Sequence, residues 1–230
     1  ATVLSAIGGK TSGAVTVTNA IVITGTNTQL TAALVTAGTL VVAATATATM
    51  SDSASTSIAA TVLSAIGAKT SGAVTVTNAI VVTGTVAEVT AALVTASTKV
   101  VAASATSTIS DATSVAEANA IDAVTTGAIT ATLDAGTIAS FSGVTGTGNI
   151  YTITVSDVAT VTQANTLDAK TTGVITATLT TGALSTFSGL TGTANVYTII
   201  VNDDAGDAIA ATGLSALGAK TDGVVTVSNA

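Results

Sequence analysis

A stretch of 20 residues occurs three times in this chain, and it constrains the fold more than any other feature. Residues 60–79 read Ala-Thr-Val-Leu-Ser-Ala-Ile-Gly-Ala-Lys-Thr-Ser-Gly-Ala-Val-Thr-Val-Thr-Asn-Ala. Residues 1–20 repeat this stretch with one change, Gly9 for Ala68, and residues 211–230 repeat it with a few conservative changes. The stretch predicts a short helix, a glycine stop and a strand. Repetition of such a unit is typical of stacked-repeat architectures.

Longer periods contain this stretch. The block 1–52 matches 60–111 at an offset of 59 residues, and a second repeat, from Asp111 onward, has an offset of 46 residues. Stacked repeats of this kind bury a continuous core between neighbours. The periods divide the chain into nine expected coils, each running helix, turn, strand, turn: 1–25, 26–52, 53–84, 85–111, 112–136, 137–157, 158–182, 183–203 and 204–230.

These coils indicate an α/β fold. A strand that follows a helix in every coil implies parallel strands, with the helices as crossover connections. We therefore expect a solenoid of about nine helix–strand coils with a parallel sheet. An all-β solenoid is the alternative. Because the chain has no proline and no polar or glycine-rich linker, we expect one repeat array over 1–230, a segment of a longer chain or filament.

Strands are expected where β-branched residues alternate with threonine, which is the pattern of a half-buried strand. The expected ranges are 74–82, 100–109, 151–155 and 197–201, with their copies. Apolar spacings of three and four predict helices. The two sets with this spacing are Ile58, Val62, Ile66 and Val86, Val89, Leu93. The shorter segments around Phe141 and Phe187 predict a single helical turn each.

The glutamate and glutamine residues mark expected helix starts. Each lies three positions after a threonine or a serine, which is the spacing of a capping box. In that motif, the hydroxyl group of the first residue and the side chain of the residue three positions later each accept a hydrogen bond from an exposed backbone N–H. The pairs are Thr26–Gln29, Thr85–Glu88, Ser114–Glu117 and Thr160–Gln163.

Lysine and glycine mark the expected helix ends. Each of four lysines precedes a glycine by three residues, as Lys69 precedes Gly72. A lysine in the last turn favours the negative end of the helix dipole, and a glycine just beyond supplies a left-handed stop. The other pairs are Lys10–Gly13, Lys170–Gly173 and Lys220–Gly223. The fifth lysine, Lys99, lies between an expected helix and an expected strand.

Composition argues against several classes of function. Charged residues make up 7% of the chain, against about 25% in an ordinary globular domain. Five lysines and a net charge of -7 supply no cationic surface for nucleic acid. The sequence has no cysteine, so we expect no thiolate metal site, and the absence of thiols fits any compartment, including an extracellular one. No apolar run reaches the length of a membrane span, and the N-terminus has no signal-peptide pattern.

Aspartates recur at one turn of the repeat: Asp52, Asp111, Asp157 and Asp203. Asp204 and Asp207 lie close to the last of them. Oxygen ligands in a turn are suited to calcium, so calcium at Asp203, Asp204 and Asp207 stays an alternative. The preferred interpretation is that these aspartates cap the following helix, and we expect no metal site and no cofactor.

Two other patterns resemble binding or catalytic sites. Gly9-Lys10-Thr11-Ser12 resembles the end of a phosphate-binding loop, but the helix comes before it rather than after, so we expect a helix end. Asp122 and Asp168 occupy equal positions in consecutive repeats. Paired carboxylates can hydrolyse glycosides, but a solvated helix face is the preferred interpretation for this pair.

Thr-x-Thr patterns recur at Thr45/Thr47/Thr49, Thr75/Thr77, Thr130/Thr132 and Thr176/Thr178. Regular threonine rows on a sheet are suited to ice binding or O-linked sugars, and equally to a solvated face with good β-propensity. Nucleophilic catalysis fits poorly, because without histidine or cysteine only schemes based on Ser–Lys or threonine remain. We expect no catalytic residue.

The duplicated Val-Thr-Val-Thr-Asn-Ala and Thr-Gly-Val-Ile-Thr-Ala-Thr-Leu units resemble those of the giant Thr/Ala/Val-rich repeat proteins of bacterial surfaces. These are adhesins, S-layer proteins and sheath or filament subunits. The resemblance implies an extracellular, non-enzymatic, polymeric role at the cell surface, and it assigns no functional residue. The expected partner is the chain itself, as a head-to-tail homopolymer or a continuation of the same chain. Cell-surface glycans are a further possible partner, whereas nucleic acid is not expected.

Three hypotheses follow from these observations. The first is a structural protein of an extracellular fibre, sheath or S-layer. The second is a binding module, such as an adhesin stalk or a glycan- or ice-binding surface. The third and least favoured is an enzyme acting on polysaccharide. An exposed aromatic or acidic pocket would favour the second or third, and only Phe141, Phe187, Tyr151 and Tyr197 are available to build an aromatic one.

Overall fold

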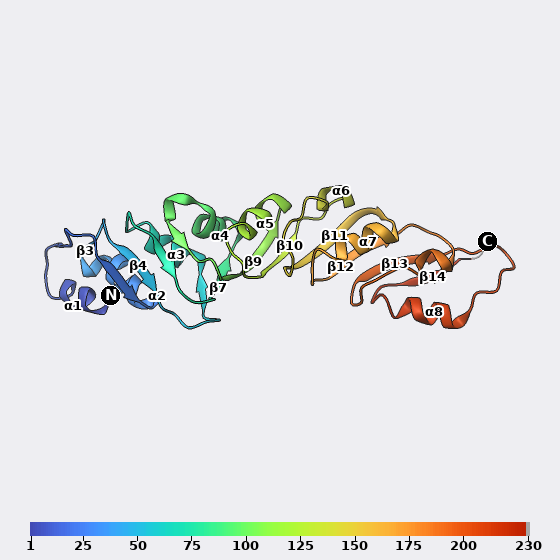
Figure 1. The fold of residues 1–230 in the computed structure, drawn as a ribbon, viewed down its shortest axis with the longest axis horizontal. Helices are drawn as coiled ribbons and strands as arrows, with labels where there is room; N and C mark the ends of the chain where they lie inside the picture. Colours follow the sequence, from blue (N-terminus) through green and yellow to red (C-terminus); the bar gives the residue numbers. More distant parts are fainter. Residues whose placement is uncertain (229–230) are drawn as a thin grey trace. The chain divides into compact units, whose positions relative to one another are not determined.

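The computed structural model describes residues 1–228 and is a mixed α/β protein (Figure 1). The described residues contain eight α-helices and parallel strands and form no closed barrel. The helices rule out the all-β alternative. The chain groups into two compact units: unit 1 holds Ala1–Asp111 and Ala120–Thr130, and unit 2 holds Ala112–Asn119 and the residues from Ala131 onward.

Unit 1 contains short helical segments that recur with the sequence repeat. The α-helices are α1 (Thr2–Gly8), α2 (Asn27–Leu30), α3 (Ala60–Gly67) and α4 (Val86–Val89). Each four-residue helix continues into a wider π-helical turn and then a 3₁₀ turn, namely η1 (Thr31–Val35) with η2 (Ala37–Thr39), and η3 (Thr90–Val94) with η4 (Ala96–Thr98). Helix α5 (Val115–Asp122) contributes residues to both units.

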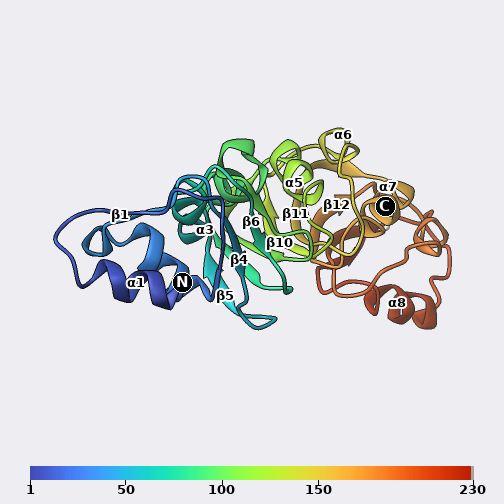
Figure 2. The same cartoon turned by 60° about the vertical axis from the view of Figure 1, so that its left-hand side comes forward.

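The strands of unit 1 form narrow parallel sheets. β1 (Val15–Thr16) pairs with β3 (Val41–Val42). A second sheet has the order β2 (Val22–Gly25), β4 (Thr47–Met50), β6 (Val74–Val76), β8 (Val100–Val101). A third set has the order β5 (Ser57–Ala59), β7 (Val81–Gly84), β9 (Thr106–Thr113). Figure 2 shows α1 and β1 close to the N-terminus of the chain.

Unit 2 continues the pattern with longer strands. β11 (Ile150–Ala159), β12 (Ile175–Leu179), β13 (Val196–Val201) and β14 (Val225–Val227) pair in that order and in parallel. The helical segments are α6 (Ile138–Phe141), α7 (Val161–Asp168), η5 (Leu184–Phe187) and α8 (Ala211–Gly218). β10 (Ile129–Leu133) is shared between the units. The single turns at Phe141 and Phe187 confirm the prediction made for those two segments.

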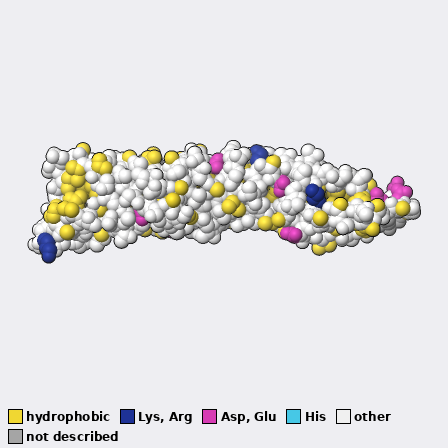
Figure 3. All heavy atoms as spheres, turned by 60° about the horizontal axis from the view of Figure 1, so that its bottom comes forward, with side chains coloured by type: hydrophobic (Ala, Val, Ile, Leu, Met, Phe, Trp, Pro, Cys, Tyr) yellow, Lys and Arg dark blue, Asp and Glu magenta, His cyan; other side chains and the backbone are white. Residues whose placement is uncertain are grey.

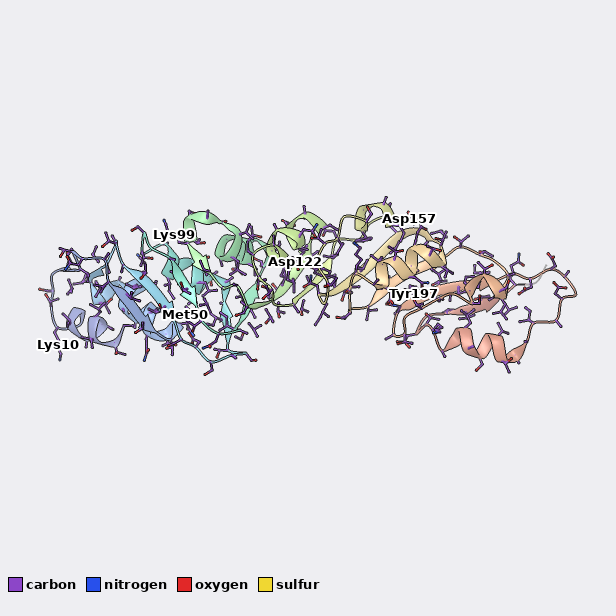
Figure 4. All side chains as sticks on the ribbon, viewed as in Figure 1. Lys10, Met50, Lys99, Asp122, Asp157 and Tyr197 are labelled. Atoms are coloured by element: carbon purple, nitrogen blue, oxygen red, sulfur yellow. The ribbon has the colours of Figure 1, made fainter. Side chains whose placement is uncertain are left out.

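Alternation along the strands places the core. In β12, Ile175, Ala177 and Leu179 are buried while the two threonines between them are exposed. In unit 1, the side chain of Met50, in β4, is fully buried (Figure 4). Alanine and β-branched residues fill most of the interior. Helices and strands that carry such small side chains can pack closely against one another.

Two long predicted strands are each divided in the structure. The range 74–82 forms β6 and β7, and the range 100–109 forms β8 and the start of β9. A turn interrupts each: Ile80 N–H donates to Asn78 at 2.9 Å, and Ala105 N–H donates to Ala102 at 3.0 Å. β-propensity alone does not reveal these turns. The helix predicted to include Ile58 begins later, since Ile58 lies in β5.

All four capping boxes are confirmed. In the Thr85–Glu88 pair, Glu88 N–H donates to the threonine hydroxyl at 3.3 Å, and Thr85 N–H donates to the glutamate carboxylate at 2.9 Å. The pairs that begin at Thr26, Ser114 and Thr160 form the same two hydrogen bonds. The spacing of hydroxyl, carboxylate and carboxamide side chains is therefore enough to locate these helix starts.

The predicted glycine stops are wrong. The α1, α3, α7 and α8 helices end in right-handed conformation at Gly9, Ala68, Ala169 and Ala219. The lysines lie just beyond these caps, rather than in the last turn. Among the described glycines with positive φ, none is a predicted stop. Left-handed residues do follow the 3₁₀ turns, but they are Leu40 and Lys99.

These glycines have another role, which is close contact with a neighbouring backbone. A Cβ atom on Gly72 would lie 2.6 Å from the Ala46 carbonyl oxygen. On Gly173 or Gly223 it would lie nearer than 3.0 Å to the carbonyl oxygen of Tyr151 or Tyr197 respectively. Real Cβ atoms do not approach backbone oxygens so closely, so only glycine fits.

A threonine two residues before Gly173 and before Gly223 completes this contact, whereas Thr70, two residues before Gly72, donates to the Gly72 carbonyl at 3.0 Å. Thr171 Oγ1 accepts a hydrogen bond from Tyr151 N–H at 2.7 Å and donates to the Tyr151 carbonyl at 2.9 Å. Thr221 makes the same pair of bonds with Tyr197, at 2.8 and 3.1 Å. Thr125 donates to the Ala105 carbonyl. We call this unit the Thr-x-Gly clasp, and it binds the backbone of the preceding strand segment.

We predict that Gly173→Ala destabilises the protein by about 1–3 kcal/mol, the usual cost of forcing atoms into a packed contact. The matched control is Gly189→Ala, because nothing lies within 4 Å of a Cβ placed there. Urea unfolding of both variants measures the difference. Equal midpoints for Gly173→Ala and the wild type would show that the clasp tolerates a side chain.

Candidate functional site

The recurring aspartates connect the chain to a helix that came earlier. Asp52 Oδ2 accepts a hydrogen bond from the Asn27 N–H at 2.6 Å, and its Oδ1 accepts from the Asn27 side chain at 2.7 Å. Asp111 accepts from the Val86 N–H at 2.7 Å. In each case the amide belongs to the first residue of a helix that lies 25 positions before the aspartate.

Unit 2 has the same arrangement over a shorter separation. Asp157 accepts from the Ile138 N–H at 2.8 Å, and Asp203 accepts from the Leu184 N–H at 3.1 Å. Both partners lie 19 positions earlier. The prediction that these aspartates cap the following helix is therefore wrong in direction. They cap the preceding one, and so they tie the end of each such segment to its beginning.

Electrostatics explains why the residue is an aspartate. The exposed N–H groups at a helix N-terminus carry partial positive charge, so a carboxylate there is stabilising. At α2, Thr26 and Gln29 satisfy each other's N–H groups through the capping box, and Asp52 satisfies that of Asn27. Side chains therefore accept hydrogen bonds from the backbone N–H groups of Thr26, Asn27 and Gln29 at the start of this short helix.

Asp204 and Asp207 do not join this arrangement. Both are exposed, and the bond between them is from the Asp207 N–H to the Asp204 carbonyl at 3.0 Å. Over residues 1–228, no three His, Cys, Asp or Glu side chains gather in a way that would hold a metal ion. The calcium alternative at Asp203, Asp204 and Asp207 gains no support.

Asp168 is not on a solvated face, contrary to the prediction for it. Its Oδ1 accepts a hydrogen bond from Asn195 Nδ2 at 2.7 Å, and Asn195 is 2% exposed. Asn195 Oδ1 in turn accepts from the Ile175 N–H at 2.9 Å. This relay ties the end of α7 to the loop before β13 and to β12. Its partner in the predicted pair, Asp122, is half-buried at the end of α5.

Tyr197 lies beside this relay. Its side chain is fully buried, and its hydroxyl has no hydrogen-bond partner among the described residues. Burial raises the pKa of Tyr197 to about 12, and the nearby carboxylate of Asp168 adds to the effect. The neutral phenol is therefore the form that the fold accommodates, which suits a core side chain rather than a proton-transfer group.

The other predicted candidates do not converge. Gly9 is the C-cap of α1, as expected of a helix end rather than a phosphate loop. Within unit 1, Lys10, Lys99 and Asp122 lie apart from one another (Figure 4). In the view of Figure 3, charged side chains are few and scattered. Lys170 Nζ donates to the Val144 carbonyl at 2.8 Å, so it too holds backbone.

The threonine rows are in register between strands. In unit 1, Thr24 is paired with Thr49 and Thr49 with Thr75. In unit 2, Thr154 is paired with Thr176 and Thr178 with Thr198. The four threonines of unit 2 are exposed.

Two grooves in unit 2 lie between helical segments. One, of about 320 Å³, is lined by Phe141, Leu167 and Lys170 among others. The other, of about 430 Å³, is lined by the corresponding Phe187, Leu217 and Lys220. Both phenylalanines are at most 3% exposed and belong to the core. The grooves are spaces between short helices and bring no reactive groups together.

No protein family, curated protein or solved structure matched this chain. None of the helices within residues 1–228 has the length and apolar character needed to cross a bilayer. A proposal for the function therefore has to rest on the contacts described above, namely the aspartate caps and the Thr-x-Gly clasps. The sequence analysis did not identify the clasp threonines, although the same two-residue spacing recurs in Thr125–Gly127, Thr171–Gly173 and Thr221–Gly223.

We predict that Asp52→Ala lowers the free energy of unfolding by about 1–3 kcal/mol, because it leaves a helix N–H without a charged partner. The control is Asp204→Ala, whose carboxylate is exposed and outside the cap. Chemical unfolding followed by circular dichroism measures both. If the two variants unfold at the same denaturant concentration as the wild type, the aspartate cap is not stabilising.

Tyr197 gives a prediction at high pH. Above pH 10 the unfolded chain loses the phenol proton while the folded chain keeps it, so stability falls as pH rises toward 12. The loss across this window is on the order of 2 kcal/mol. Tyr197→Phe removes it, and the stability difference between wild type and variant should depend on pH only above 10. A difference that stays constant from neutral pH to pH 12 would contradict the burial of a neutral phenol.

Proposed function

We propose that this chain is a non-enzymatic structural repeat protein that builds an extracellular fibre, sheath or S-layer by end-to-end stacking of its coils. The observation that carries the proposal is the recurrence of one set of contacts within each segment and between consecutive segments. Aspartate caps and Thr-x-Gly clasps use backbone groups as their partners. Such contacts extend an array without depending on the identity of most side chains.

The proposal includes a solenoid of nine coils over the whole chain. Each capping aspartate is the last residue of an expected coil, as Asp52 ends 26–52 and Asp203 ends 183–203. Each caps the helix that begins that same coil. Each clasp joins one expected coil to the coil before it, as Thr221 of 204–230 binds Tyr197 of 183–203. In a repeat array stability comes from such nearest-neighbour terms.

A structural role accounts for the polar residues better than a catalytic one. Glu88, Gln29 and Gln163 form capping boxes, and Asp168 holds a backbone-linked asparagine. Each of these groups is committed to hydrogen bonds that position backbone. The location outside the cell follows from the resemblance to repeat proteins of bacterial surfaces, and the absence of cysteine is compatible with it. The partner proposed is the chain itself, with cell-surface glycans as a possible attachment and with no nucleic acid.

The alternative is an adhesin stalk or a glycan- or ice-binding module. The observation that favours it is the register of exposed threonines on neighbouring strands, Thr154 with Thr176 and Thr178 with Thr198. These hydroxyl groups repeat at the strand spacing of about 4.8 Å. Such rows suit a regular surface, but each row in unit 2 holds only two threonines, since Thr176 is paired with Val196 on its other side, so the fibre is preferred.

We predict that the purified 230-residue chain forms polymers whose size grows with concentration. Sedimentation velocity over a wide concentration range measures the size, and electron microscopy shows whether the product is a fibre or a lattice. Polymers are expected because low charge opposes association weakly and exposed strand edges favour pairing. A chain that stays monomeric at every concentration would contradict end-to-end assembly and leave the binding alternative preferred.

A further inference from the structure

The parallel sheet of unit 2 has one covered face and one open face. On the inward face, residues such as Ile175 and Leu179 are buried, and the helical segments pack there, since α7 contacts β12 and α6 contacts β11. On the outward face the alternate residues are exposed. Purely parallel sheets in proteins usually have both faces covered, so this open face is a candidate for an interaction.

The register of the strands arranges the outward residues of β11, β12 and β13 into two rows. All six residues of these rows are exposed, and all are threonine or valine. We call them the Thr/Val face. The first row is Thr154, Thr176, Val196, and the second is Val158, Thr178, Thr198.

Aliphatic side chains gather on and beside this face. Val158 is 58% exposed and Val196 is 37% exposed. Val174, two residues before Thr176 on the same side of the chain, is 39% exposed. The threonines add a methyl group each, and all these side chains are β-branched and therefore stiff. Exposed aliphatic groups that gather in one place indicate a surface that meets a partner.

The charged side chains near these strands are directed elsewhere. Asp157 belongs to β11, but its carboxylate accepts from the Ile138 N–H at the start of α6. Lys170 Nζ donates to the Val144 carbonyl, and the carboxylate of Asp203 caps Leu184. Asp222 follows at the border of the face, where its N–H donates to the Asn195 carbonyl at 2.9 Å. The two rows themselves carry no charge.

We propose that the Thr/Val face of unit 2 packs face to face on the Thr/Val face of a second copy of this chain, and so joins two fibres side by side. The inference rests on the proposed end-to-end assembly and adds a lateral contact to it. Two sheets that pack in this way lie about 10 Å apart, with the side chains of their facing rows interdigitated. The contact is isologous, because both copies contribute the same surface.

Charge and spacing favour a second copy as the occupant. The chain has a net charge of -7, but its Thr/Val face has none, so two such faces meet without repulsion and without burying an unpaired charge. A charged partner would gain nothing at this face. Both copies also have the same strand spacing, about 4.8 Å, so rows that fit at one strand fit at the next.

The size of the face explains why the contact belongs to fibres rather than to single chains. Three strands of about five residues present roughly 240 Å², whereas a stable interface buries about 800 Å² on each partner. Several consecutive chains must therefore pair together. In two fibres they do so, because each contact that forms holds the next pair of faces close to each other.

Unit 1 contains a row of the same residue types. Thr24 is paired with Thr49, Thr49 with Thr75, and Thr75 with Val101. Thr24, Thr75 and Val101 are exposed. An outward row of threonine and valine is thus a recurring property of the sheets in this chain, as a contact repeated along a fibre requires.

The test compares fibres of the full chain that differ at Thr176, which lies in the middle row position between Thr154 and Val196. Thr176→Lys places like charges opposite each other in every pair of faces. Its fibres should have about half the mass per unit length of wild-type fibres, as measured by scanning transmission electron microscopy. The matched control is Ala169→Lys, which adds the same charge at an exposed position at the end of α7 and should leave the mass per length unchanged.

A complementary charge identifies the occupant. Thr176→Glu fibres should also be thin on their own. When Thr176→Lys fibres and Thr176→Glu fibres are grown separately and then mixed, opposite charges face each other, and the mass per length should return to the wild-type value. This recovery requires both partners to use the same face, and it shows that both variants are folded. Mixed fibres that stay thin would overturn the proposal.

Thr176→Val tests what holds the faces together. It keeps the β-branched shape and removes the hydroxyl, so fibres should keep the wild-type mass per length if packed methyl groups join the faces. Loss of pairing in Thr176→Val would show that the hydroxyl row binds a hydrogen-bonding ligand, such as a glycan, and would overturn face-to-face packing.

The remaining outcomes separate the lateral contact from the assembly. Wild-type and Thr176→Lys fibres of equal mass per length would overturn the lateral contact while the proposed end-to-end assembly stands. Equal thinning by Ala169→Lys would assign the effect to net charge and also overturn the contact. A wild-type chain that forms no polymers would contradict the assembly and the lateral contact together.

Discussion

Contact between one backbone and the next is the constraint on which this structure depends. At Gly72, Gly173 and Gly223, a carbonyl of the preceding segment occupies the space that a side chain would need. At Gly173 and Gly223 the hydroxyl of the clasp threonine also bonds both the N–H and the carbonyl of one residue, as Thr171 does with Tyr151. Segments can approach this closely only where the sequence supplies glycine and small residues, so the alanine- and glycine-rich composition follows from the geometry.

Charge is used sparingly and locally. Carboxylates satisfy helix N-termini or a buried asparagine, as Asp52 and Asp168 do. A carboxylate is most effective at a helix N-terminus, because it meets N–H groups that have no partner inside the helix. The threonines on the strands cover the outer faces without charge. The resulting surface is polar yet nearly uncharged, a combination that opposes association between copies only weakly.

Much of this architecture was readable from the sequence, for reasons that differ between elements. The boxes at Thr26 and Thr85 were predictable because capping depends on residue type and local spacing. The strands at 151–155 and 197–201 were predictable because alternation lasted for a full strand. The division of 74–82 into two strands was not predictable, because the turn at Asn78 depends on contacts with the segment of Met50 and Asp52.

The candidate site was less predictable, because its partners are distant in sequence. Local rules assign a glycine after a helix to its C-terminus, so they predict helix stops where the structure has clasps. The same rules assign the aspartates to the next helix, although their amide partners lie 19 to 25 positions earlier. Spacing shows that a residue recurs, whereas only the packed structure shows which neighbour it meets.

The direction of the aspartate caps has a consequence for how the chain acquires its structure during synthesis. A ribosome or a secretion channel releases a polypeptide from its N-terminus. Each helix beginning at Asn27, Val86, Ile138 or Leu184 therefore emerges before the carboxylate that completes it, which follows 19 to 25 residues later. The carboxylate cap of each of these helices can therefore form only after the last residue of its segment has been released.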